Sequence, residues 1–562
     1  MIILCQGLLD TGKAAEAGIR TIVVRQEWTG LHMADAIGRL SAGENIAAFC
    51  MQHGPGTENS VGGVAQAYAE SAPLVAIPAG YARSKTDVDP KFNSLLNHQH
   101  VSKSCEQLTD PNAVDETMGR AFNEAKNGRP RPAVVEVPLD VFDQDVPEFE
   151  YRESVSGRSA PDPDDVQSVV DAVLEAEKPM IYAGQGIHYA QAWEPLRELA
   201  ELLAVPVVTS LDGKSAFPED HPLSLGAGSK SEPGPLHHYL QETDLIFSVG
   251  CSFTTTSYGI SVPPGVTVVH ATLDPMDINK DVRADYALIG DARLTLKAVI
   301  EKVDGRIDGD LRDRRDDVVA EIEAVSEEWM DEWRPKLTSD EQPLNPYRVI
   351  HDLGSVVDPD ETIVTHDAGN ARDMLATFWT ATEPLSYIGW GKTTQLGYGL
   401  GLAMGAKLLH PEQLCINLWG DGAIGMTMMD FETAVREEIP ILSIQLNNFG
   451  MASYDTPFTG NYAGVAESLG GYGERVESPA EITPATERGI ERTRNGVPAL
   501  LEFITAEETA ESFVRPPRYH SRPTRASMEY RTVETTAEFI ARFETDADWR
   551  GVRGAHRRRH RI

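Results

Sequence analysis

A tripeptide of small residues and a polar loop further along the chain constrain the fold more than any other feature. Gly420-Asp421-Gly422 precedes a plausible helix, and the apolar run 439–446 that follows reads as a buried strand ending just before Asn448. Parallel strands joined by a helix carry both connecting loops at the same edge of their sheet. The sequence therefore predicts an α/β domain in which Asp421 and Asn448 lie close together.

The residue types in these two loops suit an anion and a hard cation. Glycines let the backbone approach a phosphate, and the start of the following helix offers free N–H groups to an anion. A carboxylate, an amide and a backbone carbonyl are ligands for Mg²⁺ bridging a diphosphate. The alternative is a tight turn beside an asparagine pair, as a lone Gly-Asp-Gly would suggest. The spacing favours a metal–diphosphate site.

Length and cysteine content bound the other possibilities. At 562 residues the chain is long enough for about three domains. No apolar run reaches the roughly 18 residues of a membrane span, and the first residues lack the features of a secretory signal. The five cysteines are scattered, odd in number and without a Cys-x-x-Cys pair. They predict free thiols in a reducing cytoplasm.

The charge balance argues against polyanionic partners. Acidic residues outnumber basic ones 86 to 50, which gives a formal charge of −36. Such an excess repels nucleic acid and anionic membranes, so neither is an expected partner. It also fits a protein kept soluble in a salty cytoplasm, where screening removes most of the self-repulsion. A halophilic origin is the preferred explanation, and an ordinary acidic enzyme is the alternative.

Alternating strand and helix patterns divide the chain into three blocks, as expected for α/β layers around parallel sheets. A polar linker covers 147–163, and the highly charged stretch 308–333 is expected to be a solvated helical connector. The expected strands of the first two blocks are 21–24, 46–49, 74–77 and 133–137, then 180–183, 205–208, 245–248 and 266–269.

Segments in all three blocks resemble, in order, those of the thiamine diphosphate (ThDP) enzymes of the acetolactate synthase/2-oxo acid decarboxylase superfamily. The resemblance implies an α/β protein of three consecutive doubly wound parallel-sheet domains: pyrimidine-binding (1–146), central (160–304) and diphosphate-binding (340–515). An extension, 516–562, would follow. The segments that carry the resemblance are 24–34, 53–59, 128–140, 220–226 and 270–275, besides the two loops described above.

The resemblance assigns roles in the third block. Asp421, Asn448 and the carbonyl of Gly450 would hold Mg²⁺, and Asn447 would be structural. Leu396 would be the bulky side chain under the bent cofactor, a positioning effect, although a Leu in a glycine-rich segment can equally be a core residue. The remaining expected cofactor contacts are Gly420, Gly422 and Ala423.

Glu27 is the expected catalytic residue of the first block. It follows a buried strand, where a carboxylate needs a partner, although a glutamate at a strand end can also be a surface residue. By the resemblance its partner is a ring nitrogen of the aminopyrimidine, and that hydrogen bond favours the tautomer that removes the proton from thiazolium C2. In the family this glutamate serves the cofactor of a neighbouring subunit. The resemblance therefore implies at least a homodimer with the active site at the subunit interface.

The substrate side is less defined by sequence. His98 and His100 lie where relatives place acid–base or substrate-contact residues, and could relay protons near neutral pH. They could equally be loop histidines without a role. Lys392 could place a cation near a substrate carboxylate, or be an exposed loop lysine.

Two departures distinguish this chain from true acetolactate synthases. Their flavin-contacting Arg/Asp-rich segment is replaced by 251–258, and their acceptor-selecting tryptophan has no equivalent in 449–455. FAD is therefore a doubtful cofactor, and acetolactate as the product is in question. The ThDP chemistry that the whole family shares is not affected by either change.

The resulting expectation is a cytoplasmic, Mg²⁺- and ThDP-dependent transferase or lyase. It would decarboxylate a small 2-oxo acid and join the product to a second carbonyl compound, as acetolactate synthases do. The alternatives are a non-carboligating decarboxylase of the benzoylformate or oxalyl-CoA type, and a non-catalytic scaffold subunit.

Both chain ends look unusual for the family. A first strand and helix are expected to be missing, and the tail 549–562, with six arginines, is expected to be a gene-model fault.

Overall fold

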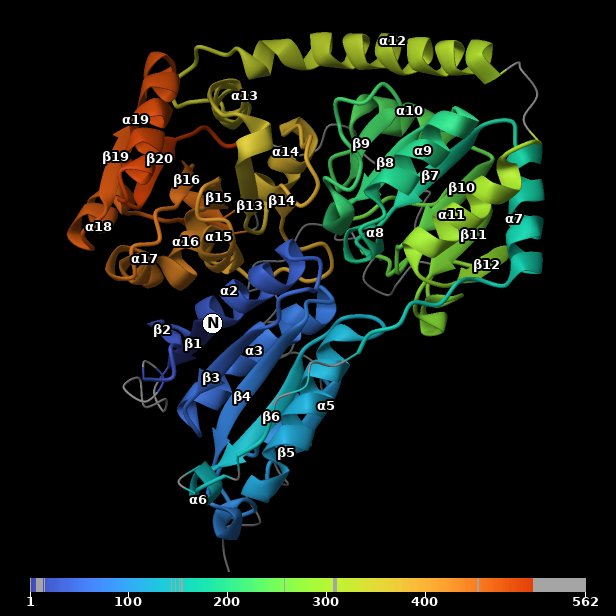
Figure 1. The fold of residues 1–562 in the computed structure, drawn as a ribbon. Helices are drawn as coiled ribbons and strands as arrows, with labels where there is room; N and C mark the ends of the chain where they lie inside the picture. Colours follow the sequence, from blue (N-terminus) through green and yellow to red (C-terminus); the bar gives the residue numbers. More distant parts are fainter. Residues whose placement is uncertain are drawn as a thin grey trace, which may run out of the picture. The chain divides into compact units, whose positions relative to one another are not determined.

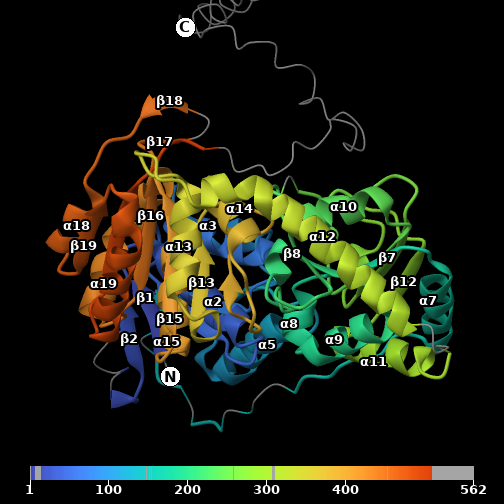
Figure 2. The ribbon, with the colours of Figure 1, turned by 90° about the horizontal axis from the view of Figure 1, so that it is seen from above.

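The structure is a computed structural model, and three parallel sheets form its framework (Figures 1 and 2). This confirms the predicted fold class. The predicted extension 516–562, with its basic tail, lies outside the described residues. The structure describes residues 2–6, 14, 16–142, 144–146, 148–150, 152, 155–256, 258–306, 311–451 and 454–508.

The N-terminal domain contains a parallel sheet in the order β2-β1-β3-β4-β6-β5. The sequence interpretation missed β1, which pairs with β2 on one side and β3 on the other, so a strand is present where the first strand was expected to be missing. The described elements are β1 Ile2–Gln6, β2 Arg20–Val23, α2 Glu27–Leu40, β3 Ala47–Met51, α3 Pro55–Ala69, β4 Leu74–Gly80, η1 Arg83–Lys85, α4 Ser94–His98, β5 Ser104–Gln107, η2 Pro111–Ala113, α5 Val114–Lys126, β6 Ala133–Pro138 and α6 Leu139–Phe142.

The central domain has the strand order β12-β11-β10-β7-β8-β9, in which the order reverses beside the first strand of the domain. Its described elements are α7 Pro163–Glu175, β7 Pro179–Ala183, α8 Gly186–Ala190, α9 Trp193–Leu203, β8 Val207–Ser210, η3 Leu211–Gly213, β9 Ser224–Gly228, α10 Gly234–Glu242, β10 Leu245–Val249, β11 Thr267–Thr272, η4 Pro275–Asp277, β12 Tyr286–Ile289 and α11 Ala292–Val303, followed by the connecting helix α12 Leu311–Leu337.

The C-terminal domain repeats the topology of the first. Its main sheet has the order β14-β13-β15-β16-β20-β19, so when the strands of each six-stranded sheet are numbered along the chain, both sheets have the order 2-1-3-4-6-5. Its described elements are α13 Pro346–Val356, η5 Pro359–Glu361, β13 Thr362–His366, α14 Asn370–Phe378, β14 Tyr387–Ile388, α15 Tyr398–Leu409, β15 Leu414–Gly420, α16 Asp421–Thr427, η6 Met428–Asp430, α17 Phe431–Arg436, β16 Leu442–Asn447, β17 Gly450–Met451, β18 Tyr454–Pro457, α18 Tyr462–Ser468, β19 Tyr472–Val476, η7 Pro479–Glu481, α19 Ile482–Arg494 and β20 Ala499–Ile504.

The sheets are buried on both faces, as is usual for parallel sheets. In β10, Leu245, Phe247 and Val249 belong to one hydrophobic cluster, whereas Ile246 belongs to another. Successive side chains of a strand point to opposite faces, so each cluster fills the space between one face of the sheet and the helices that cover it. This explains why the strands read as continuous apolar runs in the sequence.

Helix α12 is more than the predicted solvated connector, because one of its faces is buried. Trp329 stacks on Phe378 of α14 with ring centroids 5.3 Å apart, and Trp333 meets Tyr347 of α13 edge-on at 4.8 Å. These aromatic contacts fix the helix on the C-terminal domain. The many charged residues elsewhere on the helix masked this stripe in the sequence.

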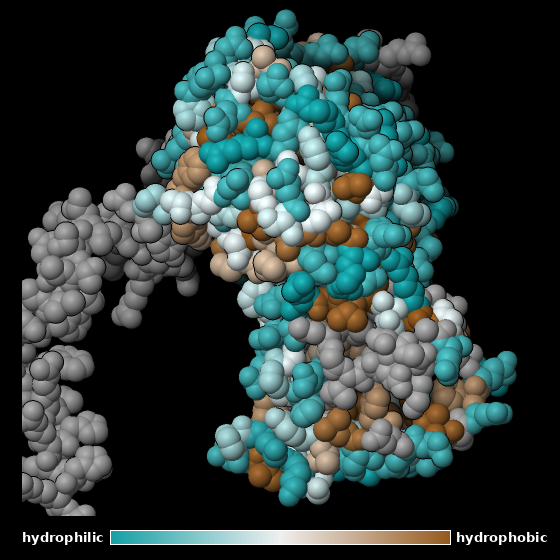
Figure 3. Space-filling view, turned by 90° about the vertical axis from the view of Figure 1, so that its left-hand side faces the viewer, coloured by the Kyte–Doolittle hydropathy of each residue, from teal (hydrophilic) through white to brown (hydrophobic). Residues whose placement is uncertain are grey.

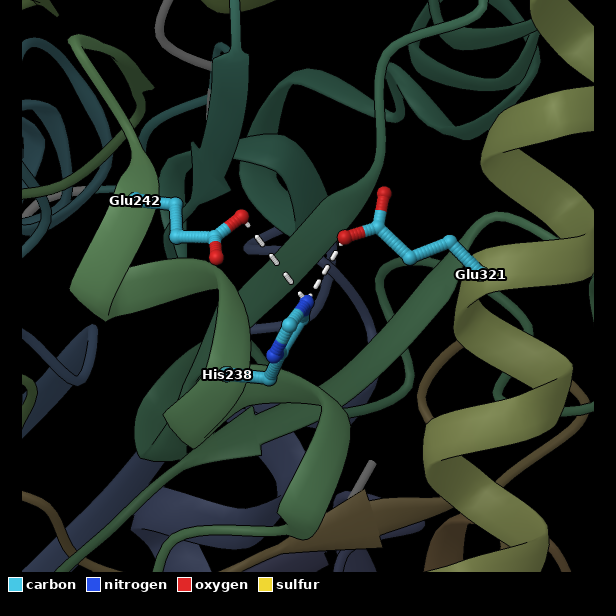
Figure 4. A group of neighbouring side chains, drawn as sticks. All are labelled: His238, Glu242 and Glu321. Atoms are coloured by element: carbon cyan, nitrogen blue, oxygen red, sulfur yellow. Dashed lines mark hydrogen bonds and ion pairs between the residues drawn. The ribbon is translucent and has the colours of Figure 1, made fainter.

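A polar cluster fixes the same helix to the central domain. His238 lies between Glu242 and Glu321, with Nε2 2.6 Å from Glu321 Oε1 and 3.9 Å from Glu242 Oε2 (Figure 4). The ammonium of Lys178 contacts both carboxylates and lies 2.6 Å from Glu321 Oε1. Because this cation already offsets one of the two negative charges and contacts both carboxylates, we interpret the group as an ion-pair cluster between α10 and α12.

The face of the molecule in Figure 3 is mostly hydrophilic. Hydrophilic residues predominate over the upper part of the face in Figure 3, and apolar residues gather in smaller patches lower down. No helix in the described part of the chain is long and apolar enough to cross a membrane.

Candidate active site

Two loops of the C-terminal domain meet at the carboxyl edge of its sheet. β15 and β16 are adjacent parallel strands, with Gly420 opposite Leu446. Asp421 Oδ2 accepts the Gly450 N–H at 2.8 Å, and Asn448 Oδ1 accepts the same N–H at 3.2 Å. The convergence predicted from the spacing is therefore present, while the role of these residues as metal ligands stays a prediction.

Asp421 is an unusual carboxylate because it is only 4% exposed. Burial raises its pKa to about 6, and backbone N–H groups at Gly450, Asn448 and Phe449 partly counteract that shift. No lysine or arginine of the described residues forms an ion pair with it. A buried carboxylate whose only described partners are N–H groups suits a bound cation.

Glycine and asparagine complete this edge of the sheet. A Cβ on Gly420 would meet only Leu446 O, at 4.0 Å, so the backbone there faces open space. Gly420 is the N-cap residue of α16 and has no side chain that could cap the helix, whereas Ala423 in the first turn of α16 is buried in the core. Asn447 points the other way: its Nδ2 donates to Glu502 Oε1 at 2.7 Å and its Oδ1 accepts the Phe449 N–H at 3.0 Å.

Glu27 is the first residue of α2 and is 3% exposed. Burial raises its pKa, which the hydrogen bond from Asn59 partly offsets. Asn59 Nδ2 donates to Oε2 at 3.2 Å, and a Cβ on Gly56 would lie 3.2 Å from Oε1. Sequence interpretation missed Asn59 and Gly56 as supports of Glu27, although both lie in the 53–59 segment that carries the resemblance.

Leu396 lies in the turn that begins α15 and packs half-buried against the core cluster that includes α2. The turn is fixed by Asp367, whose carboxylate accepts the N–H groups of Gly397 at 3.1 Å and Gly399 at 2.9 Å. Gly397 adopts φ +86°, a conformation that favours glycine. Its carbonyl accepts the hydroxyl of Thr427 in α16 at 2.9 Å. The Leu396 turn is thereby joined to the helix that Asp421 begins.

Helices α2 and α15 bring the two halves of the candidate site together within one chain. Glycines permit the close approach: a Cβ on Gly401 would lie 2.8 Å from Thr29 O, and one on Gly405 would lie 2.8 Å from Ala36 Cβ. Next to Leu396, Gln395 Oε1 lies 3.1 Å from His32 Nε2 of α2. Glu27, Leu396 and the loop of Asp421 therefore border the same junction between domains.

Known proteins match this chain in all three domains. Models of the thiamine pyrophosphate enzymes match residues 4–108 (N-terminal TPP binding domain), 166–299 (central domain) and 367–503 (C-terminal TPP binding domain). The chain belongs to the thiamine pyrophosphate enzymes. Together these matches confirm the predicted family, and the chain is a ThDP-dependent enzyme of the acetolactate synthase superfamily.

Three similar relatives are large subunits of acetolactate synthases. A probable acetolactate synthase large subunit of Methanococcus aeolicus is 28% identical, over 88% of this chain and 87% of its own length. A probable acetolactate synthase large subunit of Methanocaldococcus jannaschii is 29% identical, over 88% of this chain and 87% of its own length. The acetolactate synthase isozyme 3 large subunit of Escherichia coli is 29% identical, over 85% of this chain and 86% of its own length.

The three residues predicted on the substrate side of this ThDP enzyme lie in different surroundings. His98 is buried, with Nδ1 2.8 Å from Ser94 O and Nε2 3.3 Å from Ser60 Oγ, and burial lowers its pKa. His100 is exposed. The structure therefore separates the two histidines by environment and gives no contact between them.

Lys392 is neither an exposed loop lysine nor a free cation. Its ammonium contacts Asp212 in η3 of the central domain, and its side chain is 13% exposed. Glu70 of the N-terminal domain accepts the N–H groups of Gly391 and Lys392, both at 3.0 Å, and that of Thr393 at 3.2 Å. All three domains meet at this segment, just before the Leu396 turn.

Aromatic packing involves the segment that replaces the flavin-contacting one of acetolactate synthases. Tyr258 meets Trp390 edge-on with centroids 5.3 Å apart. The guanidinium of Arg372 lies 3.9 Å from the Tyr258 ring centroid and 4.4 Å from that of Trp390. The end of the segment, at Tyr258, therefore packs against the C-terminal domain, and FAD stays a doubtful cofactor that these contacts do not test.

Proposed function

We propose that this ThDP enzyme is Mg²⁺-dependent and decarboxylates a small 2-oxo acid, then joins the product to a second carbonyl compound in the manner of an acetolactate synthase. The observation that carries the proposal is the buried Glu27 at the contact between α2 and α15. The Leu396 turn begins α15, and Asp421 and Asn448 converge in the same C-terminal domain. The names of the relatives support the reaction class.

The described residues fit the metal and the cofactor. Asp421 and Asn448 present oxygen atoms to one spot, beside the open backbone of Gly420. Oxygen ligands suit Mg²⁺, and the cation would balance the buried charge of Asp421. We assign the metal to Asp421, Asn448 and the carbonyl of Gly450, and the diphosphate to the backbone from Gly420 to Ala423.

Glu27 is positioned to exchange a proton with a ring nitrogen of the cofactor. Because Asn59 occupies Oε2, Oε1 remains for that nitrogen. Burial raises the pKa of Glu27, and a carboxyl group with a raised pKa is suited to exchange a proton with that nitrogen. Bound ThDP supplies the carbon nucleophile and the electron sink. Leu396 offers an apolar surface that orients the cofactor.

Two matched pairs of variants test this assignment. Glu27→Gln should lower turnover by roughly 10²–10⁴-fold, the range for loss of an acid–base group, while ThDP binding measured by calorimetry persists. Asp421→Asn should abolish saturable Mg²⁺–ThDP binding. The exposed residues Glu44 and Asp360 provide the controls Glu44→Gln and Asp360→Asn.

The assay should offer pyruvate, 2-oxobutyrate and benzoylformate in concentrated KCl, because the charge of −36 supports a halophilic origin. CO₂ release together with a 2-alkyl-2-hydroxy-3-oxo acid product agrees with carboligation. CO₂ with an aldehyde alone contradicts carboligation and leaves a simple decarboxylase. Unchanged turnover in Glu27→Gln would refute the role of Glu27.

We further propose a homo-oligomer whose active site is shared between subunits, as the resemblance implies, in a cytoplasm that keeps the described cysteines free. The α2–α15 contacts, formed here within one chain, can equally form between two copies, because exchange of identical elements preserves every contact. Mixing the inactive Glu27→Gln and Asp421→Asn chains after unfolding and refolding tests this. A shared site restores about a quarter of wild-type activity, because half of the dimers are mixed and each holds one intact site. No restoration would mean that each chain completes its own site.

A further inference from the structure

The start of the catalytic helix is held by a residue from a different domain. Asp430 ends the short helix η6 of the C-terminal domain and is 1% exposed. Its Oδ1 accepts the N–H of Arg25 at 2.7 Å, and its Oδ2 accepts the N–H of Gln26 at 3.1 Å and the hydroxyl of Thr29 at 2.7 Å. These three donors surround Glu27 in the sequence.

Helix α2 lacks a cap of its own. The residue before Glu27, Gln26, is extended and makes no side-chain cap hydrogen bond. Uncapped N–H groups at a buried helix start are costly, and a carboxylate there also interacts favourably with the helix dipole. Asp430 supplies that carboxylate from about 400 residues away along the chain.

The carboxylate of Asp430 is itself fixed in place. The hydroxyl of Thr433, three residues further along, donates to Oδ1 at 2.8 Å. With Arg25, Gln26 and Thr29, this gives the group four donors. Such a set determines both the position and the orientation of the carboxylate, and hence of the backbone that it binds.

We propose that Asp430 is a positioning residue for the reaction: it caps α2 across the domain junction and so holds the Glu27 carboxylate at the cofactor. The inference rests on the proposed role of Glu27. A neighbouring residue provides a contrast. Glu432 crosses the same junction through its ion pair with Arg25, 2.7 Å, but that guanidinium is half exposed and the pair does not touch the start of the helix.

The first test compares Asp430→Asn with Glu432→Gln. The asparagine amide can accept on one atom only, so one of the two backbone N–H groups just before α2, that of Arg25 or that of Gln26, loses its acceptor. Backbone amide hydrogen exchange in the peptide spanning residues 24–31 of the cofactor-free protein should rise at least tenfold in Asp430→Asn and stay within twofold in Glu432→Gln. Turnover at saturating ThDP should fall by about 10²-fold in the first variant, as expected for a small misplacement of a catalytic group.

A double-variant cycle separates positioning from general damage. If Asp430 acts through Glu27, adding Asp430→Asn to Glu27→Gln should change the residual turnover by less than threefold. A full further 10²-fold loss in that background, or wild-type turnover in Asp430→Asn alone, would overturn the inference. Wild-type turnover in Glu27→Gln would instead refute the proposed function, so the two failures are distinguishable.

A milder variant covers the case in which Asp430→Asn does not fold. Thr29→Ala removes one donor to the Asp430 carboxylate and leaves the carboxylate in place. Exchange in the same peptide should rise and turnover should fall three- to tenfold, again without effect in the Glu27→Gln background. Thr29→Ala with unchanged exchange and turnover would count against Asp430 as a cap.

Discussion

The close contact of α2 and α15 predicts a strong response to a single methyl group. In Gly405→Ala the new Cβ would lie 2.4 Å from the backbone oxygen of Met33 and 2.8 Å from Ala36 Cβ, whereas carbon atoms in contact prefer about 3.5–4.0 Å. The helices must separate by about 1 Å. Overpacking of this kind costs about 1–3 kcal/mol, and a shift of about 1 Å at a catalytic group can lower turnover about 10²-fold.

Gly119→Ala is the matched control, because Gly119 lies within α5 and a Cβ there meets nothing within 4 Å. Both substitutions gain the same helix propensity, about 1 kcal/mol, so the difference between the two variants isolates the overpacking. Calorimetric unfolding and turnover at saturating ThDP are the assays. Equal unfolding temperatures, with turnover of Gly405→Ala within twofold of the control, would refute the argument that α2–α15 packing positions Glu27.

Three further predictions concern buried charge and exposed histidine. Burial raises the pKa of Asp367 in the folded protein from 3.8 to about 6, so this group stabilises the fold below the unfolded pKa and loses that contribution as pH rises through 6. The free energy of unfolding of wild type should therefore exceed that of Asp367→Asn by about 2 kcal/mol more at pH 4.5 than at pH 7.5. A difference in denaturant unfolding that does not change with pH would contradict this prediction. Lys392→Met leaves buried Asp212 without its cation. It should lower the free energy of unfolding by about 3–5 kcal/mol relative to the exposed control Lys297→Met. A raised KM with unchanged stability would instead show that Lys392 serves the substrate. His100→Ala, at an exposed side chain, should keep turnover within twofold, and a larger loss would restore the predicted proton relay.

Much of the fold could be predicted because both faces of each sheet are buried. The expected strand 180–183 lies within β7, Pro179–Ala183, and 74–77 lies within β4, Leu74–Gly80. Where apolar content falls, the prediction failed: β5, Ser104–Gln107, is half-buried at the sheet edge and has no apolar run. The predicted strand 439–446 begins later, at Leu442, after Pro440, which cannot donate to a strand ladder.

The candidate site was predictable only where its chemistry is local. Asp421 and Asn448 follow adjacent strands, so their spacing indicated that they would meet. Asp430, Asp367 and Glu70 were missed, because each binds backbone N–H groups of a distant segment. Hydrogen bonds to the backbone leave no residue-type signature in the partner, and only the folded chain reveals them.

The shared strand order of the first and third sheets gives the α2–α15 contact a further meaning. Each helix connects the second and third strands of its own domain, so the two are topologically equivalent. Glu27 begins one helix, and the Leu396 turn begins the other. An interface between equivalent elements is the arrangement of a twofold dimer. The protein thus contains, within one polypeptide, an internal pseudodimer, and under the proposed assignment one half would handle protons and the other would hold the diphosphate.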